Sequence, residues 1–396
     1  MTLDDFAFLL SPAGERWLAE LAATPITKHN HLQIVTRLRR DLSPAYTQAV
    51  METAVLRQKA VIKFSRAAQM YFTRPALEQS SSEIISAYRA RRFADAGVQR
   101  VADLGCGIGG DAIGLAAHAQ VIGVEMDALR LAMAEQNLKA YGRGDHFQSL
   151  HADFTTLSPL DVDGLFFDPA RRDERGKRFF SVEAYQPPLS WIDEWRGIVG
   201  ETAVAPTAVK ISPGVDYDEL PADAEVEFIS VRGELKEAVL WYGDLRTAVT
   251  RRATLLVDGN IHTMTTTDMP DHITIAPPKR FLYEPDNAII RAHLVKQLAA
   301  QLGATKLDDH IAYLSSDEQI ETPFARRFPI DDSFPFQLKR LRRYLRERDI
   351  GQVTIKKRGS PLEPDTLRRQ LRLRGEKACT IFLTFVEGET AVLVSL

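Results

Sequence analysis

The sequence predicts an α/β protein whose central part is a doubly wound, Rossmann-like sheet. Residues 101–110 have the pattern of a buried strand, a tight glycine turn and the start of a helix. From about residue 100 onward, strand and helix patterns alternate, which is typical of parallel sheets. A length of 396 residues corresponds to two or three domains at roughly 100–200 residues each. We expect an N-terminal helical region over residues 1–80, a nucleotide-binding domain over 81–275 and a C-terminal α/β domain over 276–396.

The composition is that of an ordinary globular protein, and it narrows the classes of function. Hydrophobic residues make up 45% of the chain and charged residues 26%, with a formal net charge of -3. Cys106 and Cys379 form neither a metal-ligand pattern nor a secreted disulfide framework, so we expect no metal site. The N-terminus lacks a signal-peptide pattern, and no apolar run approaches the ~20 residues of a membrane span. We therefore expect a cytoplasmic protein without membrane contact, and the sequence indicates no particular oligomeric state.

The expected elements follow from the spacing of apolar residues, in chain order. Apolar residues recur at helical intervals over residues 1–75, and Ser80–Glu83 has the pattern of an N-cap before a helix that leads into the first strand. Strands are expected at residues 100–104, 121–125, 146–151, 163–168 and 206–212. Helices are expected at residues 109–118, 127–141 and 186–197. Two closely spaced strands at 226–231 and 237–242 predict a closing antiparallel hairpin.

The rest of the chain is expected to alternate again. A hairpin over residues 254–264 would turn at Asp258-Gly259, and two prolines at 277–278 mark a boundary. Further expected elements are helices at 289–302, 337–348 and 365–373, a strand at 353–357, and a final hairpin of 379–386 and 390–395.

The glycine turn predicts a site for a nucleoside cofactor. A side chain at Gly105, Gly107 or Gly109 would keep a ligand away from the backbone, and glycine reaches positive φ at little cost. Glu125 ends the next apolar run about 20 residues later, where an acid can hydrogen-bond both hydroxyls of a ribose. The glycine spacing also fits a dinucleotide. However, Asp103 would repel a pyrophosphate, whereas it attracts the ammonium and sulfonium groups of S-adenosylmethionine (SAM).

This stretch resembles motif I of class I SAM-dependent methyltransferases, and the resemblance implies roles for two further acids. In such enzymes an acid at the position of Asp153, after the third strand, contacts the adenine amino group; a strand-end cap is the alternative role of Asp153. Asp168-Pro169 resembles the first half of the Asp/Asn/Ser-Pro-Pro-aromatic motif of enzymes that methylate exocyclic amines. There, the polar side chain and a backbone carbonyl accept hydrogen bonds from the amine and align its nitrogen with the methyl carbon.

The second half of that motif is different in this chain. Ala170-Arg171 stands where the motif has a proline and an aromatic residue, so the group that stacks on a target base is missing from its usual position. Arg171 could take this place with its guanidinium plane. The other candidates are Arg172, Phe179, Phe180 and Tyr185, and a structural salt bridge is the alternative role for the arginines.

The C-terminal part is strongly basic although the whole chain is mildly acidic. Residues 324–377 contain 16 Lys and Arg against 7 Asp and Glu, a net charge of +9. Solvated helix faces account for some of these charges, but an excess of this size favours a phosphate-bearing partner. Two sets of residues are expected to bind a nucleic-acid backbone: Lys356, Lys357 and Arg358 at the end of a strand, and Arg368, Arg369 and Arg372 at helical spacing.

Two wider resemblances refine the expected function. Residues 103–110, 141–142 and 152–154 resemble the trimethylguanosine synthase group, which methylates guanine N2 in RNA. Most of residues 45–396 resembles a bacterial family of methyltransferases with a C-terminal THUMP-like domain; the resemblance is carried by residues 88–93, 168–172, 209–214, 283–286, 355–359 and 380–384. THUMP domains bind RNA in tRNA-modifying enzymes, so the resemblance implies an RNA substrate such as tRNA or rRNA.

These observations predict a class I, SAM-dependent methyltransferase that acts on an exocyclic base amine in RNA. Asp168 and the carbonyl of Pro169 would orient the amine, and Asp103, Glu125 and Asp153 would hold SAM with the glycine turn. Two alternatives stay open: a protein or small-molecule N-methyltransferase, and an RNA-binding module with a degenerate cofactor site.

Overall fold

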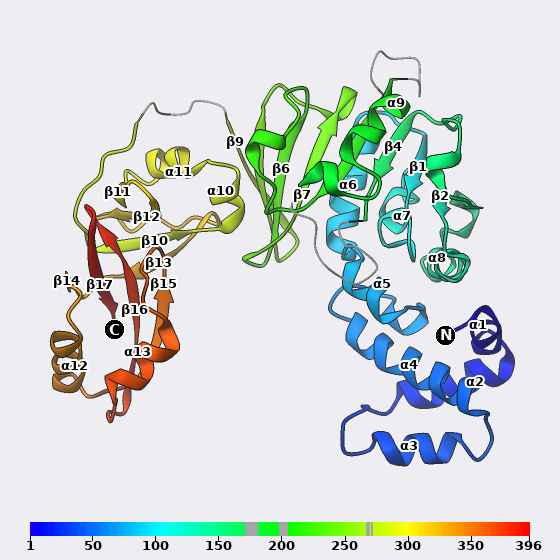
Figure 1. The fold of residues 1–396 in the computed structure, drawn as a ribbon, viewed down its shortest axis with the longest axis horizontal. Helices are drawn as coiled ribbons and strands as arrows, with labels where there is room; N and C mark the ends of the chain where they lie inside the picture. Colours follow the sequence, from blue (N-terminus) through cyan, green and yellow to red (C-terminus); the bar gives the residue numbers. More distant parts are fainter. Residues whose placement is uncertain (171–180, 198–204, 267–269, 271) are drawn as a thin grey trace. The chain divides into compact units, whose positions relative to one another are not determined.

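The computed structural model describes residues 1–396 except 171–180, 198–204, 267–269 and 271 (Figure 1). The described residues form two compact units. Unit 1 comprises Met1–Glu225 and Val239–Ala248, and unit 2 comprises Val226–Ala238 and Val249–Leu396. The boundary between the units falls within one β-hairpin, so the domain limits expected at residues 80/81 and 275/276 stay predictions.

Unit 1 begins with helices. They are α1 (Leu3–Leu9), α2 (Pro12–Ala22), α3 (His31–Leu38), α4 (Pro44–Ala60), α5 (Arg74–Gln79) and α6 (Glu83–Asp95). Serine or threonine N-caps precede α2, α4 and α5, each with a proline in the first turn. The expected cap of α6 differs, because the Ser82 side chain makes no capping hydrogen bond. Glu83 instead accepts hydrogen bonds from the N–H and hydroxyl of Ser65, at 2.6 and 2.9 Å.

Five parallel strands follow, as the sequence predicts, and form one side of a nine-stranded sheet. They are β1 (Arg100–Leu104), β2 (Gln120–Glu125), β3 (Phe147–His151), β4 (Gly164–Phe167) and β5 (Thr207–Ile211). The pairs β1–β2, β2–β3, β1–β4 and β4–β5 are all parallel. The strand order reverses between β1 and β4, and open α/β sheets bind ligands at the carboxyl ends of strands at such a point.

Helices connect these strands. The expected antiparallel hairpin is present, but it does not close the sheet, because two further strands follow it. The helices are α7 (Gly110–Leu115), α8 (Ala128–Ala140) and α9 (Ile192–Arg196). β6 (Glu225–Val231) and β7 (Glu234–Tyr242) are joined by Arg232-Gly233, whose φ values of 50° and 81° suit a primed two-residue turn. β8 (Arg251–Val257) and β9 (Asn260–Thr265) form the second expected hairpin, which turns at Asp258-Gly259. The hydrogen-bonded order is β3-β2-β1-β4-β5-β7-β6-β8-β9.

Unit 2 continues with two four-stranded sheets, ordered β11-β12-β10-β13 and β14-β17-β16-β15. The strands of the first are β10 (Phe281–Pro285), β11 (Thr305–Asp308), β12 (Ile311–Ser316) and β13 (Ala325–Pro329). Those of the second are β14 (Asp332–Pro335), β15 (Ile350–Lys357), β16 (Lys377–Val386) and β17 (Glu389–Ser395). The helices are α10 (Asn287–Arg291), α11 (Val295–Gln301), α12 (Leu338–Glu347) and α13 (Pro364–Leu371).

Strand β16 contributes to both cores of unit 2. Phe382 packs with Tyr313 and Phe328 of the first sheet, whereas its neighbours Ile381 and Leu383 pack in the core that α12 and α13 cover. Alternation of side chains along the strand produces these two opposite contacts. The second sheet is therefore buried on both faces at its centre.

Two features of unit 2 differ from the sequence prediction. The helix expected over residues 289–302 is two helices, α10 and α11, because His293 between them adopts a φ of +56°. Strands β10 to β14 were not expected from the sequence. The later elements α12, β15, α13, β16 and β17 confirm the expected ones to within a few residues at each end.

Candidate active site

The glycine turn after β1 adopts the backbone conformation that its residue types permit. Gly105, Gly107 and Gly109 have φ values of 82°, 56° and 81°. The N–H groups of Gly105 and Cys106 both donate to the carbonyl of Val124 in β2, at 2.9 and 3.0 Å. These bonds hold the turn against the neighbouring strand at the point where the sheet order reverses.

The three glycines serve different purposes. A Cβ on Gly107 would have no described heavy atom within 4 Å, so this position leaves open space among the described residues. A Cβ on Gly109 would lie 2.7 Å from the Leu138 Cδ2 atom, so this glycine is needed for packing against α8. A Cβ on Gly105 would lie 3.4 Å from the carbonyl oxygen of Asp168, which places the ends of β1 and β4 side by side.

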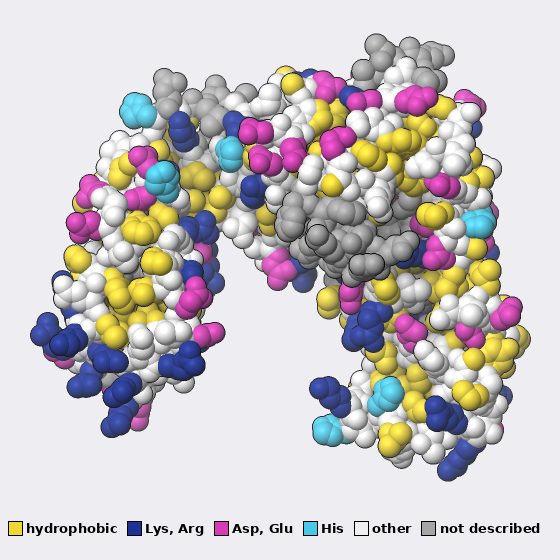
Figure 2. All heavy atoms as spheres, in the orientation of Figure 1, with side chains coloured by type: hydrophobic (Ala, Val, Ile, Leu, Met, Phe, Trp, Pro, Cys, Tyr) yellow, Lys and Arg dark blue, Asp and Glu magenta, His cyan; other side chains and the backbone are white. Residues whose placement is uncertain are grey.

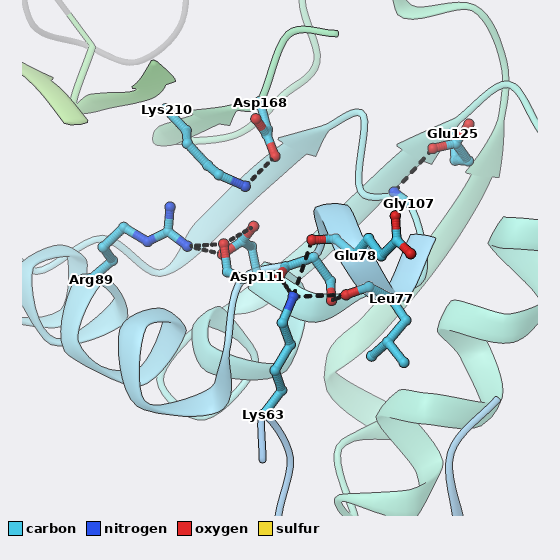
Figure 3. Close-up of polar contacts among 11 residues, drawn as sticks. Lys63, Leu77, Glu78, Arg89, Gly107, Asp111, Glu125, Asp168 and Lys210 are labelled. Carbon is cyan, nitrogen blue, oxygen red and sulfur yellow. Dashed lines mark hydrogen bonds and ion pairs between the residues drawn. The ribbon is translucent and has the colours of Figure 1, made fainter. Parts of the chain in front are cut away.

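Glu125 is held at the glycine turn by two backbone donors. Its carboxylate accepts hydrogen bonds from the N–H of Gly107 at 3.0 Å and from the N–H of Asp127 at 2.9 Å (Figure 3). The side chain is buried, and each oxygen has one of these partners. A carboxylate oxygen can accept more than one hydrogen bond, so capacity remains for the two hydroxyls of a ribose.

Asp103, at the end of β1, is buried with an unsatisfied oxygen. Its Oδ2 atom has no hydrogen-bond partner among the described residues. Burial, followed by the nearby carboxylates of Asp111 and Asp168, raises the pKa of Asp103 well above its usual range; Arg89 and Lys210 oppose this shift. A buried carboxylate of this kind is costly unless a cationic partner pairs with it. The ammonium group of SAM supplies one, so these residues fit that cofactor.

Arg89 of α6 and Asp111 of α7 form an ion pair that the sequence patterns did not predict (Figure 3). The Arg89 side chain is 2% exposed, and its Nη2 atom also donates to the Ser81 hydroxyl at 2.7 Å. The Ser81 hydroxyl in turn lies 3.1 Å from Asp111 Oδ2. The available signal was Arg89 itself, because it lies in the 88–93 segment that carries the family resemblance.

Lys63 ties the N-terminal helices to the segment that contains Ser81. Its Nζ atom donates to the carbonyls of Leu77, Ser80 and Glu78 at 2.7, 2.9 and 3.2 Å, which satisfies carbonyl groups at the end of α5 (Figure 3). The connection between α5 and α6 therefore has a defined path beside the glycine turn.

Asp168 follows β4 and pairs with a buried lysine. Lys210 of β5 places its Nζ atom 2.6 Å from Asp168 Oδ2, and the lysine side chain is 4% exposed (Figure 3). Asp168 itself is 24% exposed, so part of its carboxylate can still be reached. Lys210 was not predicted from the sequence, although it lies in the 209–214 segment that carries the family resemblance.

The residues expected to stack on a target base belong only in part to the described chain. Pro169 is buried, and Ala170 pairs with Gln186 in an isolated bridge. Arg171 lies outside the described residues, as do Arg172, Phe179 and Phe180. Tyr185 is described, and its expected role is wrong: the ring is 1% exposed, and its hydroxyl accepts a hydrogen bond from the N–H of Ser212 at 3.1 Å.

Asp153 has the geometry of a local cap. Its exposed carboxylate accepts hydrogen bonds from the N–H and hydroxyl of Thr155, at 3.0 and 2.7 Å, and begins a short 3₁₀ helix. The next residue, Phe154, packs its ring against Phe167 and Trp191, with centroids 5.9 and 5.2 Å away. The expected contact between Asp153 and adenine stays a prediction.

The expected basic cluster of unit 2 is engaged within the fold. Lys356 forms an ion pair with Glu284, and Lys357 lies 2.6 Å from Glu363. Arg358 lies over the Tyr313 ring, 5.2 Å from its centroid. β15 therefore places Lys356 and Arg358 against partners distant in sequence, and Lys357 against Glu363 six residues away. The binding of this cluster to a nucleic acid stays a prediction.

A second group of cations in unit 2 is exposed and includes the expected Arg368, Arg369 and Arg372; we name it the α12–α13 basic face. Its members are Lys339, Arg343, Arg346, Arg368, Arg369, Arg372 and Arg374. Figure 2 shows Lys and Arg side chains gathered over these helices. Arg342 links the two helices by donating to the carbonyl of Gln370 at 2.6 Å. A hollow of about 440 Å³ beside Arg368 is lined by Gly351, Gln352, Val353 and Leu373.

Comparison with known proteins decides the family. Two curated relatives, from the CDC 1551 / Oshkosh and H37Rv strains of Mycobacterium tuberculosis, are named uncharacterized S-adenosylmethionine-dependent methyltransferases. Each is 35% identical to this chain over 351 residues, which is 85% of this chain and 92% of the relative. The chain belongs to this family of SAM-dependent methyltransferases. SAM is accordingly the cofactor of this methyltransferase.

Further matches cover the parts of the methyltransferase. A family described as RNA cap guanine-N2 methyltransferase matches residues 98–184, a THUMP domain-like family matches 325–395, and a domain of unknown function matches 2–60. A crystal structure from Porphyromonas gingivalis W83, assigned to the methyltransferases, shares the fold with a TM-score of 0.73. It covers 96% of both chains at 21% identity. The expected class I methyltransferase fold with a THUMP-like C-terminal domain is thus confirmed.

Two kinds of feature are absent from the described residues. Among them, no helix of the methyltransferase is long and apolar enough to cross a membrane. No group of three or more His, Cys, Asp or Glu side chains in the described part of the chain could hold a metal ion.

Proposed function

We propose that this methyltransferase transfers the methyl group of SAM to an exocyclic amine of a base in RNA, of the guanine N2 type. The observation that carries the proposal is Asp168-Pro169 at the end of β4, immediately beside the glycine turn. The carbonyl oxygen of Asp168 lies 3.4 Å from the point where a Gly105 Cβ would stand. An amine bound at Asp168 would therefore lie next to the methyl donor.

The cofactor would be held by residues of β1, β2 and the glycine turn. Glu125 would accept hydrogen bonds from the ribose hydroxyls, and Asp103 would pair with the ammonium group. Gly107 would leave room for the ligand backbone to approach. Met126 directly follows Glu125 and is 69% exposed, so its thioether can cover a face of the adenine. Asp153 would contact the adenine amino group as its position in the family pattern implies.

Positioning would supply much of the rate. When bound, SAM supplies a methyl group from a sulfonium, which loses its positive charge as the methyl moves. Asp168 would accept a hydrogen bond from the target amine, and the carbonyl of Pro169 would accept a second one. These contacts would hold the nitrogen lone pair in line with the methyl carbon. Arg171 remains a candidate for stacking on the base.

RNA as the substrate is supported by two independent parts of the chain. The matched RNA cap guanine-N2 methyltransferase family covers residues 98–184, which include β1, the glycine turn and Asp168. The THUMP domain-like match over residues 325–395 contains the α12–α13 basic face. Exposed arginines on two adjacent helices suit a phosphate backbone, and we propose tRNA or rRNA as the source of that backbone.

A protein or small-molecule N-methyltransferase is the second candidate. Ala170 stands where base-specific enzymes carry proline, and this departure favours a smaller or different acceptor. An RNA-binding module with a degenerate cofactor site is disfavoured, because Asp103, Glu125 and Asp168 are all present and arranged around the glycine turn. The buried thiols of Cys106 and Cys379 are free, which supports our proposal of a reducing cytoplasm as its compartment.

The test is methyl transfer from tritium-labelled SAM into total RNA, DNA and protein of a cell that lacks the enzyme. We expect label in RNA, and digestion to nucleosides should place it on N2-methylguanosine. Asp168→Asn should abolish the label, while Asp145→Asn, an exposed control on the same unit, should not. Label confined to protein would rule out RNA as the acceptor, and label in no fraction would favour a binding module.

A further inference from the structure

Lys210 is a buried cation next to the residue proposed to orient the target amine. Its side chain is 4% exposed, and Nζ lies 2.6 Å from Asp168 Oδ2 (Figure 3). An ammonium group withdrawn from water in this way is costly unless a charge partner compensates it. Lys210 lies near the carboxyl end of β5, at a buried position where an aliphatic side chain would pack in the core without that cost.

The surroundings of Asp168 explain what a cation achieves there. Asp103 is repelled by the carboxylates of Asp111 and Asp168 and attracted by Arg89 and Lys210. Arg89 is held by Asp111 and Ser81 on the α6 side. Lys210 is therefore the cation on the Asp168 side.

The electrostatic balance at Asp103 shows that Lys210 acts beyond its own ion pair. Burial raises the pKa of Asp103 most, repulsion from Asp111 and Asp168 raises it further, and Arg89 and Lys210 lower it. The thiol of Cys106 in the glycine turn stays neutral, because burial raises its pKa well above the usual range. If Lys210 were removed, Arg89 would be left, of these two cations, to oppose the repulsion of Asp103 by Asp111 and Asp168.

We propose that Lys210 is a positioning residue that allows Asp103 and Asp168 to be charged at the same time, one toward the methyl donor and the other toward the acceptor. The proposal rests on the proposed function for the acceptor half. Lys210 would occupy Oδ2 of Asp168 and leave Oδ1 for the target amine. The ion pair would also hold the Asp168 carboxylate in one orientation. Because Asp168 is partly exposed, its carboxylate could otherwise rotate.

The transfer step balances with Lys210 unchanged. The amine nitrogen forms the new C–N bond, and the electron pair of the broken C–S bond stays on sulfur, which becomes neutral. The nitrogen then carries a positive charge and releases one proton, which Oδ1 of Asp168 accepts and passes to water. Lys210 keeps its proton throughout and stabilises the carboxylate before and after the transfer.

The first measurement follows SAM affinity between pH 5 and pH 8 by calorimetry, which requires no RNA. In Lys210→Met the affinity should fall at neutral pH, and the pH at which it is half lost should rise by about one unit, because Asp103 keeps its proton to higher pH. Lys210→Arg keeps the charge and should restore most of the parental profile. Lys139→Met, an exposed lysine of α8, is the matched control and should change nothing.

A double variant separates charge from packing. Asp168→Asn combined with Lys210→Met removes one group that raises the pKa of Asp103 and one that lowers it. The pH profile of SAM affinity should then return toward that of the parent, although methyl transfer stays lost. If Lys210→Met does not fold, the double variant is compared with Asp168→Asn: it should lose SAM affinity at a higher pH, and coincident profiles would overturn the role of Lys210.

The second measurement is single-turnover methyl transfer at saturating SAM. Lys210→Met should lower the rate by about 10-fold or more, with a smaller change in the RNA concentration needed for half-saturation.

The outcomes distinguish this proposal from the proposed function. A folded Lys210→Met protein with an unshifted SAM-affinity profile would overturn the role of Lys210. So would a double variant whose affinity profile is shifted as far as that of Lys210→Met. If the parent binds SAM but labels no RNA, the acceptor assignment fails, and the affinity profiles still decide whether Lys210 keeps Asp103 charged.

Discussion

Asp103 shows how function at a single residue opposes stability. Its carboxyl is buried, and burial together with two neighbouring acids raises its pKa well above the usual range. The sign follows directly: a folded-state pKa above that of the unfolded chain favours folding at low pH, and this contribution is lost as the pH rises through the folded-state value. At neutral pH, Asp103 therefore destabilises the cofactor-free protein.

We predict that Asp103→Asn stabilises the cofactor-free protein at pH 7.5 by about 1–2 kcal/mol, because a neutral amide replaces the buried charge. The gain should shrink as the pH falls, because the parental carboxyl takes up its proton. SAM affinity should fall by about 10-fold or more, because the ammonium loses its charged partner. Urea unfolding at several pH values and calorimetry with SAM measure the two effects.

Asp145→Asn is the control for Asp103→Asn, because Asp145 is exposed and should affect neither quantity. A loss of stability in Asp103→Asn at pH 7.5 would show that the carboxylate has a favourable partner in the folded protein. This result would contradict the prediction that Asp103→Asn raises the free energy of unfolding while it lowers SAM affinity.

At the scale of elements, the glycine turn depends on α8 as much as on the strands. Gly109 packs against Leu138 and Ala134 of α8, whereas Gly107 has open space beside it among the described residues. Both have positive φ, so an alanine is strained at either position. Only the substitution at Gly109 also forces two packed elements apart.

We predict different consequences for the two alanine variants. Gly109→Ala should lower the free energy of unfolding by about 2–4 kcal/mol through overpacking and strain. Gly107→Ala should cost about 1 kcal/mol of stability and lower SAM affinity, because its methyl group enters the proposed ligand space. Urea unfolding and calorimetry compare the variants side by side. Equal losses of stability would contradict the assignment of Gly109 to packing.

Asn137 of α8 connects the N-terminal helical region to the glycine turn. Its side chain accepts a hydrogen bond from the N–H of Tyr71 at 2.7 Å and donates to the carbonyls of Tyr71 and Ile108 at 3.0 and 2.9 Å. It is fully buried. One amide therefore satisfies backbone groups of two segments that are distant in sequence.

We predict that Asn137→Ala lowers the free energy of unfolding by about 2–4 kcal/mol, because it leaves buried backbone groups without partners. SAM affinity should fall as well, since the carbonyl of Ile108 belongs to the glycine turn. Gln136→Ala, on the same helix and less buried, is the control. Unchanged SAM affinity in a folded Asn137→Ala protein would show that the N-terminal region does not support the turn.

At the scale of the whole molecule, opposite charges are separated along the chain. Residues 324–377 carry a net charge of +9 in a protein of net charge -3, so the remainder is acidic. The tertiary structure gives the basic residues of β15 partners outside that strand. The cations of the α12–α13 basic face are exposed, and Arg343 and Arg368 among them pair with Glu347 and Asp365 nearby in sequence. We therefore expect unit 1 to carry out methyl transfer and unit 2 to bind RNA.

We predict that Arg343→Gln, Arg346→Gln and Arg369→Gln together weaken RNA binding and reduce its salt dependence by about 0.7–0.9 in log–log slope for each phosphate that is no longer neutralised. SAM affinity should be unchanged. Lys356→Met should instead lower the stability of the protein, because Glu284 is left without its cation. Fluorescence anisotropy over a range of salt concentrations measures the first effect. Parental RNA affinity in the triple variant would exclude the α12–α13 basic face as the binding surface.

Local patterns in the sequence determined a large part of this protein. The parallel strands, the glycine turn with Glu125, and the three hairpins depend on periodicity and turn chemistry within about 20 residues, which a single sequence displays. Short strands such as β11 and the break at His293 left no clear local pattern. Only the tertiary structure decided which charges meet. Asp168 and Lys210 are 42 residues apart, and Glu284 and Lys356 are 72 apart. Ion pairs of this kind depend on which strands become neighbours in a sheet, and strand pairing is settled by packing across the whole fold rather than by the residues beside each charge.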